Sequence, residues 1–229
     1  MNQVHPTAII GPHVSLGTGN IIGAYAVIGG SVTLGDDNWI GAGTKIGCPP
    51  EVRMHSHEAD WIGSDTGPGV LIGSGNVLRE DVQIHGGWKT RTLLGNGLFI
   101  MNRAYVAHDC RLENDVTLAS GVALGGHVAI GQSANLGLGT TVHQRRVIGA
   151  LAMVGMSAVI THDIPPFVKA YGNPCRPAGL NTVGLNRAGI SLQTIAKLTD
   201  ALAADGYPAS AAGLAEVDAD ITWFAESIA

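Results

Sequence analysis

The residues of this sequence best suited to chemistry are its nine histidines. Imidazole can take up and release a proton near neutral pH, which is what a general base must do. Four of the histidines and one aspartate become neighbours if the chain coils with a repeat of eighteen residues. A single outward histidine is most often a solvated surface residue, but a group of this size favours a functional site. Its members are His85, His108, Asp109, His127 and His143.

Counting along the chain gives this group its arrangement. His108, Gly126 and Gln144 lie eighteen residues apart and would form one column, with steps of about 5 Å between coils. Asp109 and His127 would form the column beside it. His85 would lie one coil earlier, near Ala107, once four extra residues after it are discounted.

A six-residue period provides the elements that would position these side chains. Aliphatic residues recur every six positions, most of them followed by glycine, and the chain contains 33 glycines. Six is an even number, so it suits strands with alternating side chains and not a helix. The residue four places after each aliphatic is usually small or apolar, and Cys110 at such a position is expected to fill the core. The sequence predicts a parallel β-helix with one short strand per hexad and three hexads per coil. The uninterrupted aliphatic series is Leu94, Ile100, Val106, Leu112, Leu118, Leu124, Ile130, Leu136, Val142, Ile148, Val154 and Ile160.

Two breaks interrupt the six-residue period, and the period ends near residue 165. Ile46 to Ile72 spans 26 residues, and Ile84 to Leu94 spans ten, four more than one hexad. We expect a loop insertion at about 48–71, a common kind of place for a binding site on a solenoid; a merely tolerated insertion is the alternative. We divide the chain into a β-helix domain at 1–165 and a linker with C-terminal helices at 166–229. Helices are expected from Ser191 to about Ala204 and from about Ser210 to the end.

Composition narrows the function classes. The formal charge is −5 and the pI about 5.9, which argues against nucleic acid as the main partner. The three cysteines form no CxxC pair and are too few for a disulfide framework. No signal peptide and no apolar run of membrane-spanning length is visible. We therefore expect a cytoplasmic protein that does not span a membrane.

The hexads resemble those of the hexapeptide-repeat acyltransferases, and this resemblance implies a left-handed coil. Longer motifs resemble the UDP-N-acetylglucosamine O-acyltransferase family of the lipid A pathway over nearly the whole chain. The segments that carry the resemblance are 4–8, 106–110, 125–128, 142–144, 163–168, 172–173 and 184–189.

The resemblance implies roles for these residues. His108 would be the general base, Asp109 would orient its imidazole, and the N–H of Gly126 would stabilise the oxyanion. The donor would be the thioester of an acyl carrier protein, the acceptor a UDP-amino-sugar, and no cofactor would be needed. The family also implies a homotrimer with its active site between subunits. Substrate contacts are expected from His85, Tyr105, His127, His143, Gln144, Met156 and Arg187.

Four departures from the family pattern concern the acceptor and the acyl chain. Tyr105 stands where the family commonly has a substrate-contacting histidine, and Arg187-Ala188 where it often has two basic residues. The 48–71 segment replaces the family's sugar-contacting loop. Met156 stands where some members have glycine in the acyl groove, and a thioether there would shorten the accommodated chain.

Other functions stay open at this point. One keeps the fold and the dyad but uses a coenzyme A donor and another hydroxyl or amine acceptor. Another is a non-catalytic scaffold. A zinc site is a third possibility, but the His-x4-His pair of hexapeptide carbonic anhydrases is absent. His55 and His57 are expected to be polar surface residues of the loop. We therefore expect no metal. An acidic carrier protein would need a basic surface to bind to, and five basic side chains could supply it. Alternatively, these side chains are scattered charges that only keep the protein soluble. Those side chains are Arg145, Arg146, Lys169, Arg176 and Arg187.

Overall fold

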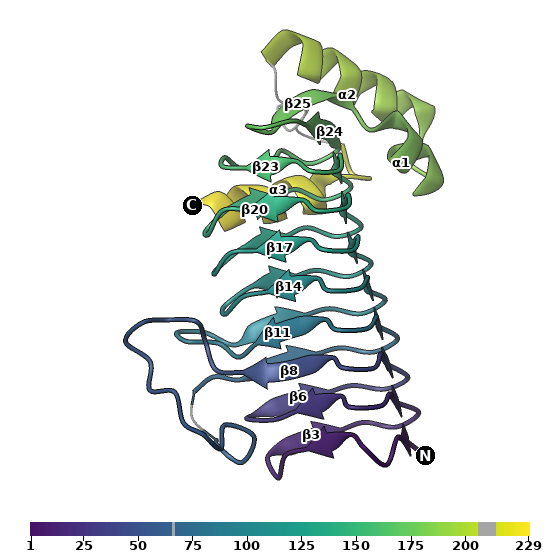
Figure 1. Cartoon of the computed structure of the whole chain (residues 1–229). Coiled ribbons are helices and arrows are strands. Elements are labelled where there is room, and N and C mark those ends of the chain that lie inside the picture. Colours follow the sequence, from purple (N-terminus) through teal and green to yellow (C-terminus); the bar gives the residue numbers. More distant parts are fainter. Residues whose placement is uncertain (66, 206–213) are drawn as a thin grey trace.

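The computed structural model describes residues 1–65, 67–205 and 214–229, which coil into a three-faced prism of short parallel strands (Figure 1). Neighbouring strands on a face come from successive coils. The coil is left-handed and the fold is the β-helix that the six-residue period predicts, followed by three short helices.

The strands form three sheets, which we call faces A, B and C. Face A consists of β1 (Gln3–Val4), β4 (Ile21–Ile22), β7 (Trp39–Ile40), β10 (Val77–Leu78), β13 (Phe99–Ile100), β16 (Thr117–Leu118), β19 (Asn135–Leu136), β22 (Met153–Val154), β24 (Val168–Tyr171) and β25 (Arg176–Leu180). Face B consists of β2 (Ile9–Ile10), β5 (Val27–Ile28), β8 (Lys45–Cys48), β11 (Gln83–His85), β14 (Tyr105–Val106), β17 (Ala123–Leu124), β20 (Thr141–Val142) and β23 (Val159–Ile160). Face C consists of β3 (Val14–Leu16), β6 (Val32–Leu34), β9 (Val70–Ile72), β12 (Thr92–Leu94), β15 (Arg111–Leu112), β18 (Ala129–Ile130) and β21 (Val147–Ile148).

The register between coils is the predicted one. On face B, Val106 pairs with Leu124 and Leu124 with Val142, eighteen residues apart at each step. These aliphatic side chains point inward and are buried, as is Cys110 at the inward position between them. Burying an aliphatic side chain of this size stabilises the fold by roughly 1.5–3 kcal/mol, so the core fixes which residues face outward.

The corners of the prism repeat as regularly as its strands. Asp109, His127 and Arg145 occupy the same corner on successive coils, all in the left-handed backbone region with φ of 59°, 61° and 60°. Asp109 is well suited to this conformation because its short polar side chain tolerates it. The repeated corner presents the residue before it, at positions 108, 126 and 144, in the same way on each coil.

Both breaks in the period fall at one edge of the prism. Residues 49–69 connect β8 to β9, and residues 86–91 connect β11 to β12, so each crosses from face B to face C. We call this the B–C edge; it is also the edge that carries His108, between β14 and β15. The longer segment projects from the prism beside β8 and β11 (Figure 1).

The C-terminal part differs in detail from the sequence expectation. The hexads end near Pro165, yet β24 continues face A parallel to β22, and β25 returns antiparallel to β24 where a linker was expected. Val168 and Ala170 are buried alternately along β24, a two-residue alternation without the glycine that marks a hexad. The domain boundary at 165/166 stays a prediction.

Three helices follow: α1 (Thr182–Arg187), α2 (Leu192–Asp205) and α3 (Asp218–Ile228). Ser191 caps α2, since its Oγ accepts a hydrogen bond from the Thr194 N–H at 3.2 Å. α1 was not predicted, because six residues are too few to show a helical period. The expected second helix begins at Asp218, later than Ser210; residues 206–213 lie outside the described residues.

The last helix returns to the prism and does not extend from its end. The Trp223 Nε1–H of α3 donates to Glu113 at 3.0 Å, and Arg111 lies over the Trp223 ring at 5.8 Å. α3 thus packs along face C, close to β21. None of the helices in the described ranges combines the length and the hydropathy that crossing a membrane requires.

Candidate active site

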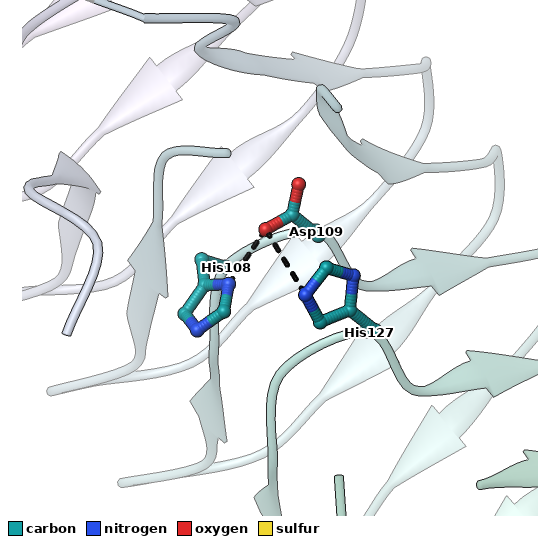
Figure 2. A group of neighbouring side chains, drawn as sticks. All are labelled: His108, Asp109 and His127. Atoms are coloured by element: carbon teal, nitrogen blue, oxygen red, sulfur yellow. Dashed lines mark hydrogen bonds and ion pairs between the residues drawn. The ribbon is translucent and has the colours of Figure 1, made fainter. Parts of the chain in front are cut away.

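The centre of the site is a histidine–aspartate pair at the B–C edge (Figure 2). His108 Nδ1 lies 2.6 Å from Asp109 Oδ2. The Asp109 side chain is completely buried, and that of His108 is 14% exposed. The predicted pair therefore forms, with a buried carboxylate behind an imidazole that solvent can reach.

Asp109 is held as an anion by the corner one coil below it. Its Oδ1 accepts hydrogen bonds from Lys89 N at 2.8 Å, Thr90 N at 2.5 Å and Thr90 Oγ1 at 3.0 Å, and its Oδ2 accepts one from Trp88 N at 3.2 Å. Burial alone would raise the pKa of this carboxyl, but these donors and His108 outweigh it and lower the pKa to about 2. An ionised carboxylate has no proton to give, so the proton between the two side chains belongs to His108 Nδ1. In the neutral form of His108, Nε2 then carries a lone pair that can accept a proton.

The imidazole lies directly over Gly126, as the eighteen-residue column predicts. A Cβ at position 126 would come within 2.6 Å of His108 Cε1 and 2.7 Å of Nε2, so only glycine fits beneath this ring. Within the described part of the chain, no group accepts a hydrogen bond from the Gly126 N–H. A glycine main chain with an unused N–H therefore lies beneath a ring nitrogen, and a base beside an oxyanion donor is the pairing that acyl transfer needs.

His127 completes the group from the coil above. Its Nε2 lies 3.7 Å from Asp109 Oδ2, and its ring meets that of His108 edge-on, with 5.2 Å between centroids. Burial lowers the pKa of His127; the Asp109 charge raises it, and Arg145 and His108 lower it further. The balance favours a neutral imidazole that can bind a substrate by hydrogen bonds.

These three side chains are also the one group of metal-ligating type that the described residues bring together. Two ligands on a tetrahedral zinc, each about 2.0 Å from the ion, would lie roughly 3.3 Å apart. The 2.6 Å between His108 Nδ1 and Asp109 Oδ2 is instead a hydrogen-bond distance, and Asp109 Oδ1 is already occupied by three donors. The geometry fits a hydrogen-bonded dyad better than a metal centre, and the expectation of no metal stays a prediction.

Tyr105 and His85 lie next to the dyad but bind the long loop. The Tyr105 hydroxyl donates to Glu51 at 2.5 Å, and burial and this carboxylate raise the Tyr105 pKa. His85 is buried against the Tyr105 ring, and its Nδ1 donates to the Pro49 carbonyl at 2.7 Å. The loop is therefore fastened over this part of the edge. No sequence signal points to Glu51, because the loop has no period from which its partner could be counted.

The other predicted contact residues lie at three different edges. His143 and Gln144 are exposed at the B–C edge, one coil above Gly126, with His143 Nδ1 donating to the Gln144 carbonyl at 3.1 Å. Met156 lies between β22 and β23, at the A–B edge, and is 72% exposed. Arg187 lines a groove of about 520 Å³ with Lys169, near the edge where face C passes to face A. One prism therefore brings His85, Tyr105, His127, His143 and Gln144 near His108 but leaves Met156 and Arg187 apart from it.

Sequence reasoning missed the residues that hold Asp109. Trp88, Lys89 and Thr90 lie in the ten-residue break, whose extra length was visible but whose position under Asp109 was not. The register of His85 is the signal that could have found them. Counting places His85 one coil below Ala107, so the residues after His85 must turn the same edge of the prism as the residues after Ala107.

Comparison with known proteins finds relatives in one family. A family model described as UDP N-acetylglucosamine O-acyltransferase, domain 2, matches residues 163–210. A protein of Janthinobacterium sp. (strain Marseille), named acyl-[acyl-carrier-protein]–UDP-N-acetylglucosamine O-acyltransferase, is 38% identical in a match 216 residues long, with 85% of this chain and 79% of that protein covered. A protein of the same name from Herminiimonas arsenicoxydans matches with the same identity and coverage.

Solved structures give the same result. A UDP-N-acetylglucosamine acyltransferase from Campylobacter jejuni superposes with a TM-score of 0.78 at 27% identity, over 98% of this chain and 95% of that one. The corresponding enzyme from Bacteroides fragilis gives 0.77 at 27% identity, over 98% and 94%. These matches show that the chain belongs to the UDP-N-acetylglucosamine O-acyltransferase family and is an acyltransferase.

Proposed function

We propose that this enzyme moves an acyl chain from the thioester of an acyl carrier protein to a hydroxyl of UDP-N-acetylglucosamine. The observation that carries the proposal is the position of His108. One ring nitrogen donates to the buried Asp109 carboxylate, and the other lies over the Gly126 main chain. The relatives named above act on these two substrates by name.

The chemistry follows from this arrangement. His108 Nε2 accepts the proton of the acceptor hydroxyl as its oxygen attacks the thioester carbonyl carbon. The carbonyl oxygen becomes an oxyanion that accepts a hydrogen bond from the Gly126 N–H. The intermediate then collapses, the C–S bond breaks, and His108 returns its proton to the departing sulfur. The thioester supplies the activated acyl group, so the proposed reaction uses no metal or organic cofactor.

A coenzyme A donor, or an amine acceptor, is the second candidate. The departures at Tyr105 and in the 48–71 segment favour it, because the Tyr105 hydroxyl donates its hydrogen bond to Glu51 of the loop.

The basic side chains bear on the first candidate. Cations that an acidic carrier protein could contact are provided by the exposed Arg145, Arg176 and Arg187 and by the half-buried Lys169. The cytoplasmic location expected from the sequence stays a prediction.

A homotrimer is part of the proposal. His108, Met156 and Arg187 lie on three edges of a rigid prism, so one subunit cannot bring them to a single substrate. Three parallel prisms around a threefold axis would set the B–C edge of one copy against a neighbour, which could supply the residues that its own edge lacks.

The first test measures the donor preference of the wild-type enzyme and compares its activity with that of His108→Ala. The wild-type enzyme should acylate UDP-N-acetylglucosamine faster with acyl carrier protein thioesters than with the matching coenzyme A thioesters. His108→Ala should lose about 10²–10⁴-fold in kcat, because the acceptor loses its base. Circular dichroism would check its folding. Full activity in a folded His108→Ala enzyme would exclude the assigned base, and a preference for coenzyme A donors would favour the second candidate.

Gly126→Ala tests the close approach beneath His108. The added Cβ would press on Cε1 and Nε2 of the ring, displacing the base from the oxyanion donor, and kcat should fall by about 10²–10³-fold. Gly17→Ala is the matched control, because a Cβ there would press on the next coil in the same way, 2.6 Å from the Gly35 carbonyl oxygen, but near the N-terminal end of the prism. Equal activity of the two alanine variants would contradict this geometry.

Met156→Gly tests the acyl groove. Removing the exposed thioether should shift the preferred donor to longer acyl chains, because the groove loses the side chain that would end it. Mass spectrometry of products formed from a mixture of carrier-linked chains measures the shift. An unchanged chain-length preference would remove Met156 from the groove.

Co-expression of two inactive variants tests the shared site. His108→Ala and Arg187→Ala homotrimers should each be impaired, but mixed trimers should recover about one quarter of the sites, those with His108 on one subunit and Arg187 on its neighbour. The rates of purified mixed and unmixed enzymes give the measurement. Activity equal to the mean of the two variants would show that each subunit works alone.

A further inference from the structure

The short break between β11 and β12 has no role in the reaction described so far. Residues 86–91 add four residues to a hexad corner, and they lie one coil below the dyad. Three consecutive main-chain N–H groups of this segment, those of Trp88, Lys89 and Thr90, point at the Asp109 carboxylate. The Thr90 hydroxyl adds a fourth hydrogen bond.

We propose that this corner is a positioning element for the catalytic base, and that Thr90 is its positioning residue. The inference rests on the proposed function, because it concerns how His108 is kept ready for that reaction. Thr90 acts through Asp109: its hydroxyl and its N–H both donate to Oδ1. With the Lys89 N–H they supply Oδ1 with three donors, and His108 is left to Oδ2.

The two carboxylate oxygens of Asp109 thus have different partners, and this controls the orientation of the His108 imidazole. A carboxylate with a free Oδ1 could turn about its Cβ–Cγ bond and offer His108 either oxygen. With Oδ1 saturated, turning would break three hydrogen bonds, and bonds to charged groups are among the stronger ones. The His108 ring is therefore held with Nδ1 toward Asp109 and Nε2 over Gly126.

The same corner also holds the main chain of Asp109 and one side of His108. The Asp109 N–H donates to Thr92 Oγ1 at 3.0 Å, which ties its backbone to β12. The Trp88 ring meets the His108 ring edge-on, with 6.3 Å between centroids, and Lys89 Nζ lies 4.1 Å from the centre of the Trp88 ring. The orientation of the base is thus fixed from the coil below.

A regular hexad corner could not do this. The corner above it, at 125–128, has no extra residues, and its main-chain N–H of His127 is used by the His108 carbonyl. Extra length is what lets three successive N–H groups turn toward one carboxylate. The chain thus places its second irregularity where a buried charge needs donors that the repeat does not provide.

The experiment compares Thr90→Val, Thr90→Ser and the wild-type enzyme by steady-state kinetics with acyl carrier protein thioesters. Thr90→Val keeps the shape but loses the hydroxyl, so kcat should fall about tenfold while KM for both substrates stays within twofold. Thr90→Ser keeps the hydroxyl and should recover wild-type kcat to within about twofold. Thr33→Val, an exposed threonine on β6 far from the site, is the matched control and should leave kcat unchanged.

A double-mutant cycle with Asp109→Asn tests whether Thr90 acts through Asp109. In the Asp109→Asn background, Thr90→Val should cause little further loss. Independent losses that multiply, or a rise in KM at constant kcat, would overturn the inference, since either would mean that Thr90 contacts substrate or acts elsewhere. Wild-type kcat in a folded Thr90→Val enzyme would also overturn it.

The proposed function fails separately. If the wild-type enzyme transfers no acyl group from either donor, the proposed reaction is wrong whatever the Thr90 variants do. If the wild-type enzyme is active, only the comparison among the Thr90 variants decides the positioning role. Thr90→Ala provides a second hydroxyl-free variant should Thr90→Val fold poorly.

Discussion

The parallel hydrogen-bond ladder of face B is the constraint on which the site depends. Val106, Leu124 and Val142 are Cα partners across β14, β17 and β20, so residues two places further on are stacked at the next corner. This is how a histidine and a glycine eighteen residues apart come into contact. Neither needs a special loop to meet the other. A register slip of one residue would turn the aliphatic side chains out of the core, so burial of these side chains protects the column at 108, 126 and 144 as well as the fold.

The buried charge of Asp109 requires more than the repeat provides. A carboxylate removed from water is costly unless hydrogen-bond donors replace the lost hydration. A regular corner offers fewer free N–H groups, since at 125–128 those of Gly125 and His127 donate to carbonyls of neighbouring coils. The four extra residues after His85 provide them. The longer insertion at 49–69 lies at the same edge and is fastened there through Glu51 and Pro49. Both insertions thus lie at the B–C edge, and the other edges of the described coils keep their short turns.

The limits of sequence prediction follow from the same division between regular and irregular segments. The period was enough to predict the β-helix, the inward position of Cys110 and the column of His108, Gly126 and Gln144, because each depends only on counting. It could not predict the Glu51–Tyr105 bond or the donors to Asp109, because partners within an insertion have no register. β24 and α1 were missed for a related reason, since each is too short or too unlike a hexad to show a pattern. The docking of α3 through Trp223 and Glu113 joins residues 110 positions apart, a contact that no local signal contains.

A rigid prism also limits how substrate can be recognised. Many enzymes close a lid or a domain over their substrates, but each coil here is hydrogen-bonded to the next along all three faces. The dyad is held from below by the corner at 86–91, and the loop beside it is fastened at two points. His108 therefore has little freedom to move toward a substrate, and the acceptor and the acyl chain must be brought to it by surfaces that are already in place. Met156 and Arg187 lie on other edges of the prism, so the proposed homotrimer would provide the enclosure that a closing domain provides in other enzymes.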